Sequence, residues 1–288
     1  MIETTITPRI ADVGGFTVER VLPSRVKRSV GPFVFLDRMG PASLDPGRGM
    51  DVLPHPHIGL AAVTYLFDGE IVHRDSIGSR QAITAGAINW MTAGSGIAHS
   101  ERTPLEVRQR ASRVDGIQLW VALPHEHEES APGFEHHPAE TMPSIDEDGV
   151  RIRLLAGSTR GASAPARTLS PLFYMEAKVP AGKSLPLPDD HEERAAYVIN
   201  GLVSCGADRI DLGRMAVFAR GTHPTLHAET DALIMLLGGT PLGARHMWWN
   251  FVSSSPDRIE QAKSDWLNQR FAKVAGDENE FVALPSRS

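Results

Sequence analysis

The sequence predicts an all-β fold made of barrels or sandwiches, with one helix near the C-terminus. Short apolar runs recur along the chain, and Gly, Pro and Asp bound them. The 26 glycines and 21 prolines are spread along the chain, which is typical of many short strands joined by turns. With 288 residues, 41% of them hydrophobic, the chain is long enough for two domains that each bury a core.

The predicted strands are short apolar or alternating segments in both halves of the chain. In the first half they are residues 33–36, 60–67, 87–91 and 116–123. In the second half they are residues 151–155, 172–179, 195–199, 215–218 and 233–237. Such regular spacing is typical of a barrel or a sandwich.

A change in composition separates the two halves. From residue 124 the apolar pattern stops, and residues 142–149 are rich in Ser, Asp and Glu. We therefore expect an N-terminal domain at residues 1–135, a linker at 136–149 and a C-terminal domain at 150–288. His125 and His127 lie in charged, Pro-rich surroundings with no apolar strand to orient them, so we interpret this pair as part of a solvated connector.

One helix is predicted close to the C-terminus. Ser255 can cap it, Pro256 fits its first position, and Asp257 complements the positive end of the helix dipole. Three apolar residues follow at helical spacing and predict a stripe that packs on a barrel: Ile259, Ala262 and Trp266. The aromatic residues just before the helix are expected in the core: Trp248, Trp249 and Phe251.

Composition and charge disfavour several classes of protein. Cys205 is the only cysteine, so no disulfide can form within the chain and a reducing compartment is expected. The N-terminus shows no secretory signal, and no apolar stretch reaches membrane-spanning length. A net charge of −6 without a concentrated basic cluster disfavours nucleic-acid binding. We therefore expect a soluble, cytoplasmic protein with no membrane partner and no direct nucleic-acid partner.

Two pairs of metal-ligand side chains are the most informative motif. His55 and His57 are two residues apart, and so are His99 and Glu101. In a β-strand this spacing places both side chains on one face, so two neighbouring strands can present three imidazoles and a carboxylate to one point. This set suits a divalent first-row ion and leaves coordination positions for water, substrate or dioxygen. Closed structural zinc sites favour cysteines, which makes such a site the weaker interpretation.

A weak internal repeat relates the two halves. Residues 86–101, which end in the second ligand pair, resemble residues 213–229. Gly69 follows the predicted strand at residues 60–67, and Gly201 follows the one at 195–199. Counting back the same number of residues from each glycine places Leu187 and Asp189 at the positions of His55 and His57. We therefore expect a degenerate, metal-free second barrel. The alternative is a second cluster formed by His191, His227 and Glu229.

Several long motifs resemble the signature of the pirin family, within the cupin superfamily. They are residues 31–37, 54–70, 73–76, 90–101 and 245–252, and together they span most of the chain. The resemblance, to bacterial pirin-like proteins, implies a bicupin with two face-to-face β-barrel (jelly-roll) domains. It implies a metal only in the N-terminal domain and a degenerate C-terminal domain that carries the terminal helix.

The family pattern identifies four residues of this sequence as metal ligands: His55, His57, His99 and Glu101. A general cupin would supply a carboxylate shortly after its H-x-H pair, but here that region reads Ala61-Ala62. Glu101 takes that place, as in pirins, and this departure argues against the sugar-isomerase and oxalate-type cupins. The resemblance thus implies one divalent transition metal per chain, with iron favoured and nickel, copper, manganese and zinc as alternatives.

The resemblance also implies an activity, quercetin 2,3-dioxygenase, in which a flavonol and dioxygen give a depside and carbon monoxide. The partner would then be a small, flavonol-like aromatic substrate. Glu101 is the catalytic candidate, because a carboxylate beside the metal could take the flavonol 3-hydroxyl proton; a purely structural ligand role is the equal alternative. A different class of function stays open: a metal- or redox-sensing module that binds a regulatory protein without turnover.

Other residues near the motifs have more ordinary interpretations. We interpret His73 as a hydrogen-bonded structural residue, with a place beside a metal ligand as the alternative. Three apolar residues could line a pocket for a flat substrate, but core packing is favoured for at least two of them: Phe33, Phe35 and Met91. The glycines of the central motif are expected at turns and close approaches: Gly86, Gly94 and Gly96.

Overall fold

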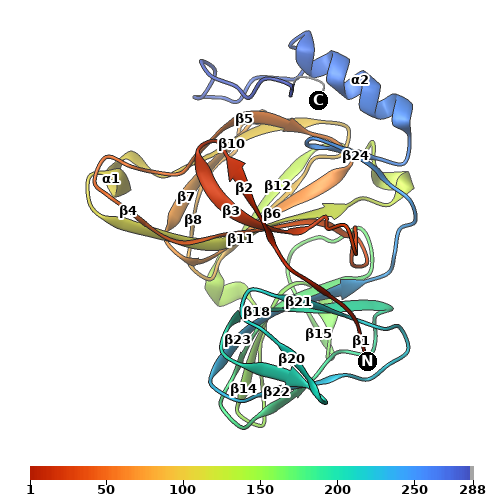
Figure 1. The fold of residues 1–288 in the computed structure, drawn as a ribbon. Coiled ribbons are helices and arrows are strands. Elements are labelled where there is room, and N and C mark those ends of the chain that lie inside the picture. The colour runs from red at the N-terminus through yellow and green to blue at the C-terminus, as the bar shows by residue number, and fades with distance from the viewer. Residues whose placement is uncertain (286–288) are drawn as a thin grey trace. The chain divides into compact units, whose positions relative to one another are not determined.

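A computed structural model describes residues 1–285 and confirms the all-β prediction (Figure 1). The chain divides into two compact units. We call residues 10–19, 37–139 and 242–288 the histidine unit, and residues 1–9, 20–36 and 140–241 the leucine unit. Within residues 1–285, no helix is long and apolar enough to cross a membrane.

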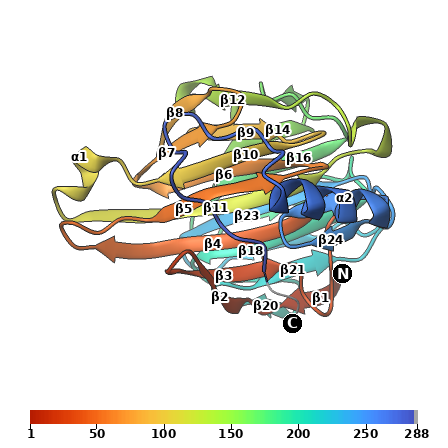
Figure 2. The same ribbon diagram turned by 90° about the horizontal axis from the view of Figure 1, so that it is seen from above.

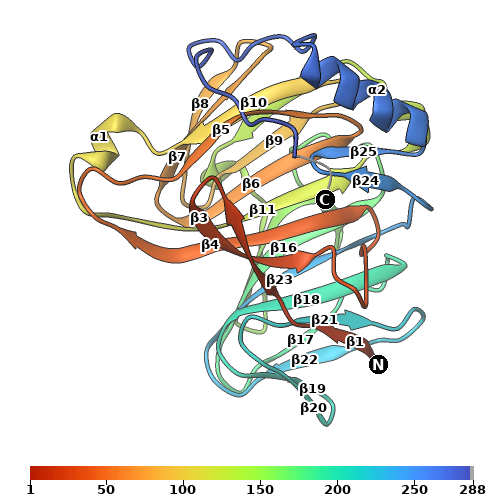
Figure 3. The ribbon, with the colours of Figure 1, turned by 45° about the horizontal axis from the view of Figure 1, so that its top comes forward.

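The histidine unit contains a small antiparallel sheet and most of a large one, whose residues 9, 20–22 and 33–36 are grouped with the leucine unit. The order of the large sheet is β12-β9-β6-β11-β4-β3-β2. Its strands are β2 (Arg9–Val13), β3 (Phe16–Leu22), β4 (Phe33–Leu44), β6 (Leu60–Asp68), β9 (Ile88–Thr92), β11 (Ser112–Ala122) and β12 (Gly133–His137). The order of the small sheet is β5-β10-β7-β8, and its strands run side by side in Figures 2 and 3. They are β5 (Asp51–His57), β7 (Glu70–Asp75), β8 (Arg80–Thr84) and β10 (Ile97–Arg102).

The leucine unit repeats this arrangement. Its large sheet has the order β1-β21-β18-β23-β16-β14-β13, with β15 paired to β14, and its small sheet has the order β17-β22-β19-β20. The large-sheet strands are β1 (Ile2–Ile6), β13 (Ser144–Glu147), β14 (Val150–Thr159), β15 (Ala162–Ser163), β16 (Leu172–Val179), β18 (Glu193–Asn200), β21 (Met215–Phe218) and β23 (Ala232–Gly239). The small-sheet strands are β17 (Ser184–Pro186), β19 (Val203–Cys205), β20 (Asp208–Ile210) and β22 (Thr225–Ala228).

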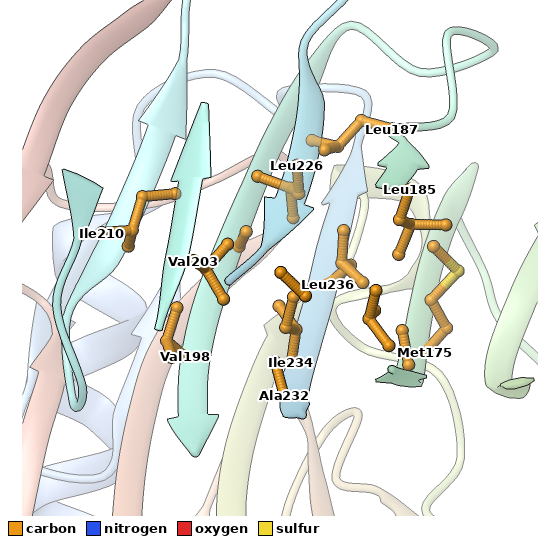
Figure 4. Packing of buried hydrophobic residues seen from close by; sticks show 14 of the residues in the cluster. Met175, Leu185, Leu187, Val198, Val203, Ile210, Leu226, Ala232, Ile234 and Leu236 are labelled. Carbon is orange, nitrogen blue, oxygen red and sulfur yellow. The ribbon is translucent and has the colours of Figure 1, made fainter. Parts of the chain in front are cut away.

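These two units confirm the bicupin expectation, with one refinement of the word barrel. In each unit the large and small sheets are separate, so the strands form an open jelly roll in place of a closed barrel. Aliphatic side chains from both sheets fill the leucine unit (Figure 4), including Leu185, Leu226 and Leu236. The histidine unit has its own apolar cluster around Met39, Met50 and Leu66.

The units are interleaved along the chain, whereas the expected domains at residues 1–135 and 150–288 are sequential. Residues 242–288 were assigned to the second domain from sequence, but in space they group with the histidine unit. The sequential boundaries therefore stay a proposal about how the chain is organised along its length.

The expected linker at residues 136–149 contains regular structure. Its first residues end β12, which pairs with β9, and the whole of β13, which pairs with β14, lies near its end. Between them lies a short 3-10 helix, Ala139–Thr141, and a similar one, His125–His127, precedes the segment. Both strands are edge strands with partly exposed side chains, which is why their composition is too polar to predict a strand.

The predicted helix is present as α2 (Pro256–Leu267), and a single-turn helix, α1 (Leu105–Arg108), follows β10. The Ser255 hydroxyl caps α2 by accepting a hydrogen bond from the backbone N–H of Arg258. Figures 1 and 3 show α2 beside the two-stranded ribbon β24 (His246–Trp248) and β25 (Phe251–Ser253). The expected apolar residues make this contact, because Ile259 and Ala262 pack with Phe251.

Candidate metal centre

The expected ligand pairs lie on adjacent strands of the small sheet of the histidine unit. In the antiparallel register of β5 and β10, His55 is directly opposite His99. On the other side of β10, Glu101 is directly opposite His73 of β7. A register shift between His99 and Glu101 breaks the regular pairing with β5 at this point. All these side chains are buried, and His57 and His99 are each only 1% exposed.

The ring nitrogens of three histidines converge. His55, His57 and His99 can each offer a ligand atom within 4.8 Å of the other two. The Nε2 atoms of His57 and His99 are 3.1 Å apart. The convergence of the three rings follows from the two-residue spacing on a strand, whereas Glu101, which the sequence placed at the same point, belongs to a second group.

A second, overlapping group shares His99. It consists of His73, His99 and Glu101, whose ligand atoms also lie within 4.8 Å of one another. His73 is therefore part of the cluster, in addition to being hydrogen-bonded as expected. The sequence signal for this position is the two-residue spacing of His73 and Asp75, which places both side chains on one face of β7. Glu101 is paired with His73, so its side chain lies on the same face of the sheet.

Backbone carbonyls fix the orientation of two of the imidazoles. His55 Nδ1 lies 2.8 Å from the carbonyl oxygen of Leu53, and His57 Nδ1 lies 3.0 Å from that of Asn250. A carbonyl oxygen only accepts, so each Nδ1 donates its hydrogen and each Nε2 keeps its lone pair. The Nε2 lone pair of His57 lies 3.1 Å from Nε2 of His99, so one cation can bind both rings when His99 also presents a lone pair there. The donor set therefore fits a metal ion that prefers imidazole nitrogen.

Burial keeps these imidazoles neutral, which is the form that binds a metal. It lowers the pKa of His55 to about 4, against an opposing effect of the hydrogen bond to Leu53. Burial likewise lowers the pKa values of His57 and His99 well below the ordinary value, and the neighbouring histidines add to this effect. At neutral pH the three rings thus carry no charge of their own.

Glu101 is the acidic member of the cluster. Burial raises the pKa of its carboxyl group, although the hydrogen bond from Thr64 and the proximity of His73 oppose this. The Thr64 hydroxyl lies 2.7 Å from Glu101 Oε1 and 2.9 Å from Gln118 Oε1. A hydroxyl has one hydrogen to donate, so this contact can serve either an ionised or a protonated Glu101.

Aromatic rings surround the cluster. Trp120 meets His57 edge-on at 5.1 Å between ring centroids, and Phe134 stacks on His73 at 4.3 Å. Of the three residues considered for a pocket wall, Phe33 and Phe35 belong to the leucine unit, where Phe33 packs 6.4 Å from Tyr174. Met91 is buried on β9 opposite Phe134. The preference for core packing agrees with these positions.

The glycines of the central motif have the special conformations that were expected. Gly86 and Gly94 have positive φ values of 84° and 51°. A side chain at Gly94 would meet the carbonyl oxygen of Ser130, so this position requires glycine.

The other candidate clusters do not form. Within residues 1–285, the His125–His127 pair belongs to no group of metal-ligand atoms, and neither do His191, His227 and Glu229. His227 is exposed beside Ser184, and Glu229 pairs with Arg209.

The alignment of the two halves by counting was wrong by two residues at the first ligand pair. The count placed Leu187 and Asp189 at the positions of His55 and His57. The strand register instead places Leu185, which is opposite Leu226, where His55 is opposite His99. Leu187 then corresponds to His57. At the second ligand pair the sequence comparison slipped by one residue, since buried Leu226 and not exposed His227 lies at the position of His99.

Comparison with known proteins gives a consistent result along the whole chain. A family model described as Pirin matches residues 15–121, and one described as the Pirin C-terminal cupin domain matches residues 174–272. A "Pirin-like protein" from Caulobacter vibrioides is 49% identical, with 99% of this chain and 100% of the relative covered. A "Putative quercetin 2,3-dioxygenase" from Pseudomonas aeruginosa is 39% identical, covering 97% of this chain and 89% of the relative.

A solved structure shares both the fold and part of the sequence. The crystal structure of a quercetin 2,3-dioxygenase from Acinetobacter baumannii superposes with a TM-score of 0.91 at 30% sequence identity. The match covers 99% of this chain and 95% of that chain. The similarity therefore includes both units.

Proposed function

The chain belongs to the pirin family, and on that premise we propose that it is a metal-dependent dioxygenase that cleaves flavonols such as quercetin with O₂. The observation that carries the proposal is the convergence of the ring nitrogens of His55, His57 and His99, with Glu101 in an overlapping group that shares His99. The names of the relatives from P. aeruginosa and A. baumannii support the choice of substrate class.

We assign the ligand role to four side chains: His55, His57, His99 and Glu101. A divalent transition metal held by these groups would supply Lewis acidity, redox chemistry and open coordination positions for small oxygen ligands. Iron is our first choice of metal, and nickel, copper, manganese and zinc fit the same donor set.

Glu101 is the group of this chain that can move a proton during the reaction. Its carboxyl group is buried, and burial raises its pKa toward the range useful for a general base. A proton taken from the flavonol 3-hydroxyl would reside on Glu101 Oε1 and face the Thr64 hydroxyl, 2.7 Å away. Thr64 can then turn its own hydrogen toward Gln118, so the proton is accommodated without moving the strands.

Oxygen uptake with a flavonol tests the proposal directly. The protein is stripped of metal, reloaded separately with iron, nickel, copper, manganese or zinc, and mixed with quercetin. We expect oxygen uptake and carbon monoxide release with one or two of these metals, and neither with His57→Ala. One bound ion per chain without turnover by any metal would refute the dioxygenase and favour the alternative, a metal- or redox-sensing module that binds a regulatory protein.

A substitution of Glu101 separates its two possible roles. We expect Glu101→Gln to retain most of the bound metal, because the amide oxygen can still ligate, and to lose flavonol turnover by about 100-fold or more, as for a removed general base. The matched control is Glu70→Gln at the start of β7, which is expected to change neither quantity. Unchanged turnover in Glu101→Gln would remove the base role and leave Glu101 as a ligand only.

A further inference from the structure

A buried line of polar side chains leads away from His99 along β7. His99 Nδ1 lies 3.4 Å from His73 Nδ1, and His73 Nε2 lies 3.0 Å from Asp75 Oδ2. All three residues are at most 2% exposed. The proposed function uses His99 as a ligand but gives no role to His73 or Asp75.

Asp75 has a definite orientation. Its Oδ1 accepts hydrogen bonds from the backbone N–H groups of Ile77, at 3.1 Å, and Ser79, at 2.9 Å. Its other oxygen, Oδ2, is thereby aimed at His73. Burial by itself raises the pKa of the Asp75 carboxyl, but the hydrogen bonds from His73 and Ser79 outweigh it and lower that pKa, so the group is ionised. An ionised carboxylate only accepts hydrogen bonds.

The position of each proton follows from this acceptor. His73 Nε2 must donate to Asp75, which leaves the lone pair of a neutral His73 on Nδ1. That lone pair accepts a hydrogen bond from His99 Nδ1, which leaves the lone pair of His99 on Nε2. That atom faces His57 Nε2 at 3.1 Å, where the proposed metal lies. The competing arrangement, in which His99 Nε2 donates to His57 Nε2, sets the lone pairs of His99 Nδ1 and His73 Nδ1 against each other at 3.4 Å.

We propose that Asp75, acting through His73, is a positioning residue that fixes the tautomer of His99 for metal binding. The proposal rests on the proposed metal site. Metal-bound histidines commonly donate their second ring nitrogen to a carboxylate or a carbonyl. His55 and His57 use the carbonyls of Leu53 and Asn250 for this purpose, and His99 uses a second imidazole backed by a carboxylate.

Asp75 disfavours the arrangement in which the ring hydrogens of His73 and His99 lie on the other nitrogen of each ring. If His99 carried its hydrogen on Nε2, His73 would have to donate from Nδ1, and its Nε2 lone pair would face the carboxylate at 3.0 Å. A lone pair beside a buried negative charge is strongly unfavourable. The ring of His73 is also held in place, because it stacks on Phe134 with an angle of 16° between the ring planes.

The variant Asp75→Asn should reverse the direction of two hydrogen bonds, the one between residue 75 and His73 and the one between His73 and His99. An amide nitrogen cannot accept, so the amide oxygen must stay with the N–H groups of Ile77 and Ser79. The amide nitrogen then faces His73 Nε2 and donates to it. His73 must carry its hydrogen on Nδ1, and His99 must carry its hydrogen on Nε2, where it blocks the metal.

Two measurements on the full chain test this inference. In metal-free protein labelled with ¹⁵N-histidine, at about pH 8 so that the rings are neutral, NMR correlations identify the protonated nitrogen of each ring. We expect Nδ1–H for His99 in the wild type and Nε2–H in Asp75→Asn. Zinc affinity, measured by chelator competition, should fall by about 10- to 100-fold in the variant, which is typical when a partner of a metal ligand is lost. Asp68→Asn, an exposed change of the same chemistry, is the control for both.

Each outcome decides a separate point. An unchanged His99 tautomer together with zinc affinity within twofold of the wild type would overturn the inference, and so would zinc-induced shifts that show His73 Nδ1 as the ligand. If the wild type binds no zinc, the proposed metal site fails, whereas the tautomer in metal-free protein still tests the role of Asp75. Should Asp75→Asn not fold, His73→Phe keeps the stacking on Phe134 and removes the acceptor for His99; wild-type zinc affinity in that variant would equally refute the proposal.

Discussion

The small sheets of the two units have the same strand order and the same pairing of equivalent residues. The buried side chains at these positions are polar in the histidine unit and apolar in the leucine unit. In the histidine unit, β5 and β10 pair His55 with His99, and β10 and β7 pair Glu101 with His73. The corresponding pairs in the leucine unit are Leu185 with Leu226 and Ala228 with Val203. The register equates the set His55, His57, His73, Asp75, His99 and Glu101 with the set Leu185, Leu187, Val203, Cys205, Leu226 and Ala228.

The difference between the two units lies in a few buried side chains at equivalent positions of the same jelly-roll backbone. The whole second set belongs to the apolar cluster of the leucine unit, where burial of aliphatic area stabilises the fold directly. In the histidine unit the same positions bury polar groups, whose desolvation costs free energy that their hydrogen bonds offset only in part. The same backbone arrangement accommodates polar or apolar side chains at these positions, so the presence of metal-ligand groups depends on the side chains alone.

The largest expected effect comes from giving the histidine unit one residue of the leucine unit. His57→Leu, which copies Leu187, should abolish stoichiometric metal binding, because it removes the ring whose Nε2 lies 3.1 Å from that of His99. Metal content per chain after dialysis, measured by mass spectrometry, checks this. The control is His227→Leu, which removes an exposed histidine of the leucine unit. Full metal content in His57→Leu would exclude the proposed ligand set.

The next effect tests the leucine unit as a purely structural counterpart. Leu226 is fully buried in its cluster, so Leu226→Ala should lower the free energy of unfolding by about 2–5 kcal/mol through the lost contacts and the remaining cavity. Metal content per folded chain should not change. Urea denaturation measures the loss, and Leu212→Ala, at a site that is 60% exposed, should stay within about 0.5 kcal/mol of the wild type. A comparable loss in both variants would contradict the assignment of Leu226 to the core.

The third effect concerns pH and the metal-free protein. The pKa of His55 is about 4 when folded and 6.5 in its ordinary state, so the unfolded chain binds more protons between these values. Stability should therefore fall as the pH drops from about 6.5 to 4, by about 3 kcal/mol for this group. His57 and His99 shift in the same direction. In the leucine unit, Glu193 has a lowered pKa, so its contribution is lost only below about pH 4.5.

Urea denaturation of chelator-treated protein at a series of pH values measures this dependence. We expect the change in stability between pH 6.5 and 4 to be smaller in His55→Leu than in the wild type. An identical pH dependence in the two proteins would mean that His55 is protonated in the folded state and that burial does not keep it neutral.

Much of the fold was predictable from the sequence, because its signals are local. Alternating strands, the Ser255–Pro256 helix start and the two-residue spacing of the ligand pairs depend on neighbouring residues only. The edge strands in residues 133–147 were not predictable in this way, since their side chains are only partly buried and no apolar alternation marks them.

The register of the repeat was also beyond simple counting. Equivalent residues are 130 positions apart for His55 and Leu185 but 127 apart for His99 and Leu226. No single offset aligns the halves, because their loops differ in length. For a related reason, the sequence supports the place of His73 beside a metal ligand only as the alternative interpretation. Its neighbours Glu101 and His99 come from β10, and only the pairing of β7 with β10 brings them together.

The hydrogen bond from His57 to Asn250 joins residues that are 193 positions apart. During translation, His57 emerges from the ribosome long before the carbonyl that orients it exists. The neighbouring β-bridge between Ile58 and Phe251 likewise forms only after Phe251 has been synthesised. A nascent or truncated chain that ends before residue 250 therefore holds an incompletely oriented ligand. If the proposed metal site forms, a chain truncated before residue 250 should therefore hold the ion less tightly than the whole chain, because it lacks the carbonyl that orients His57.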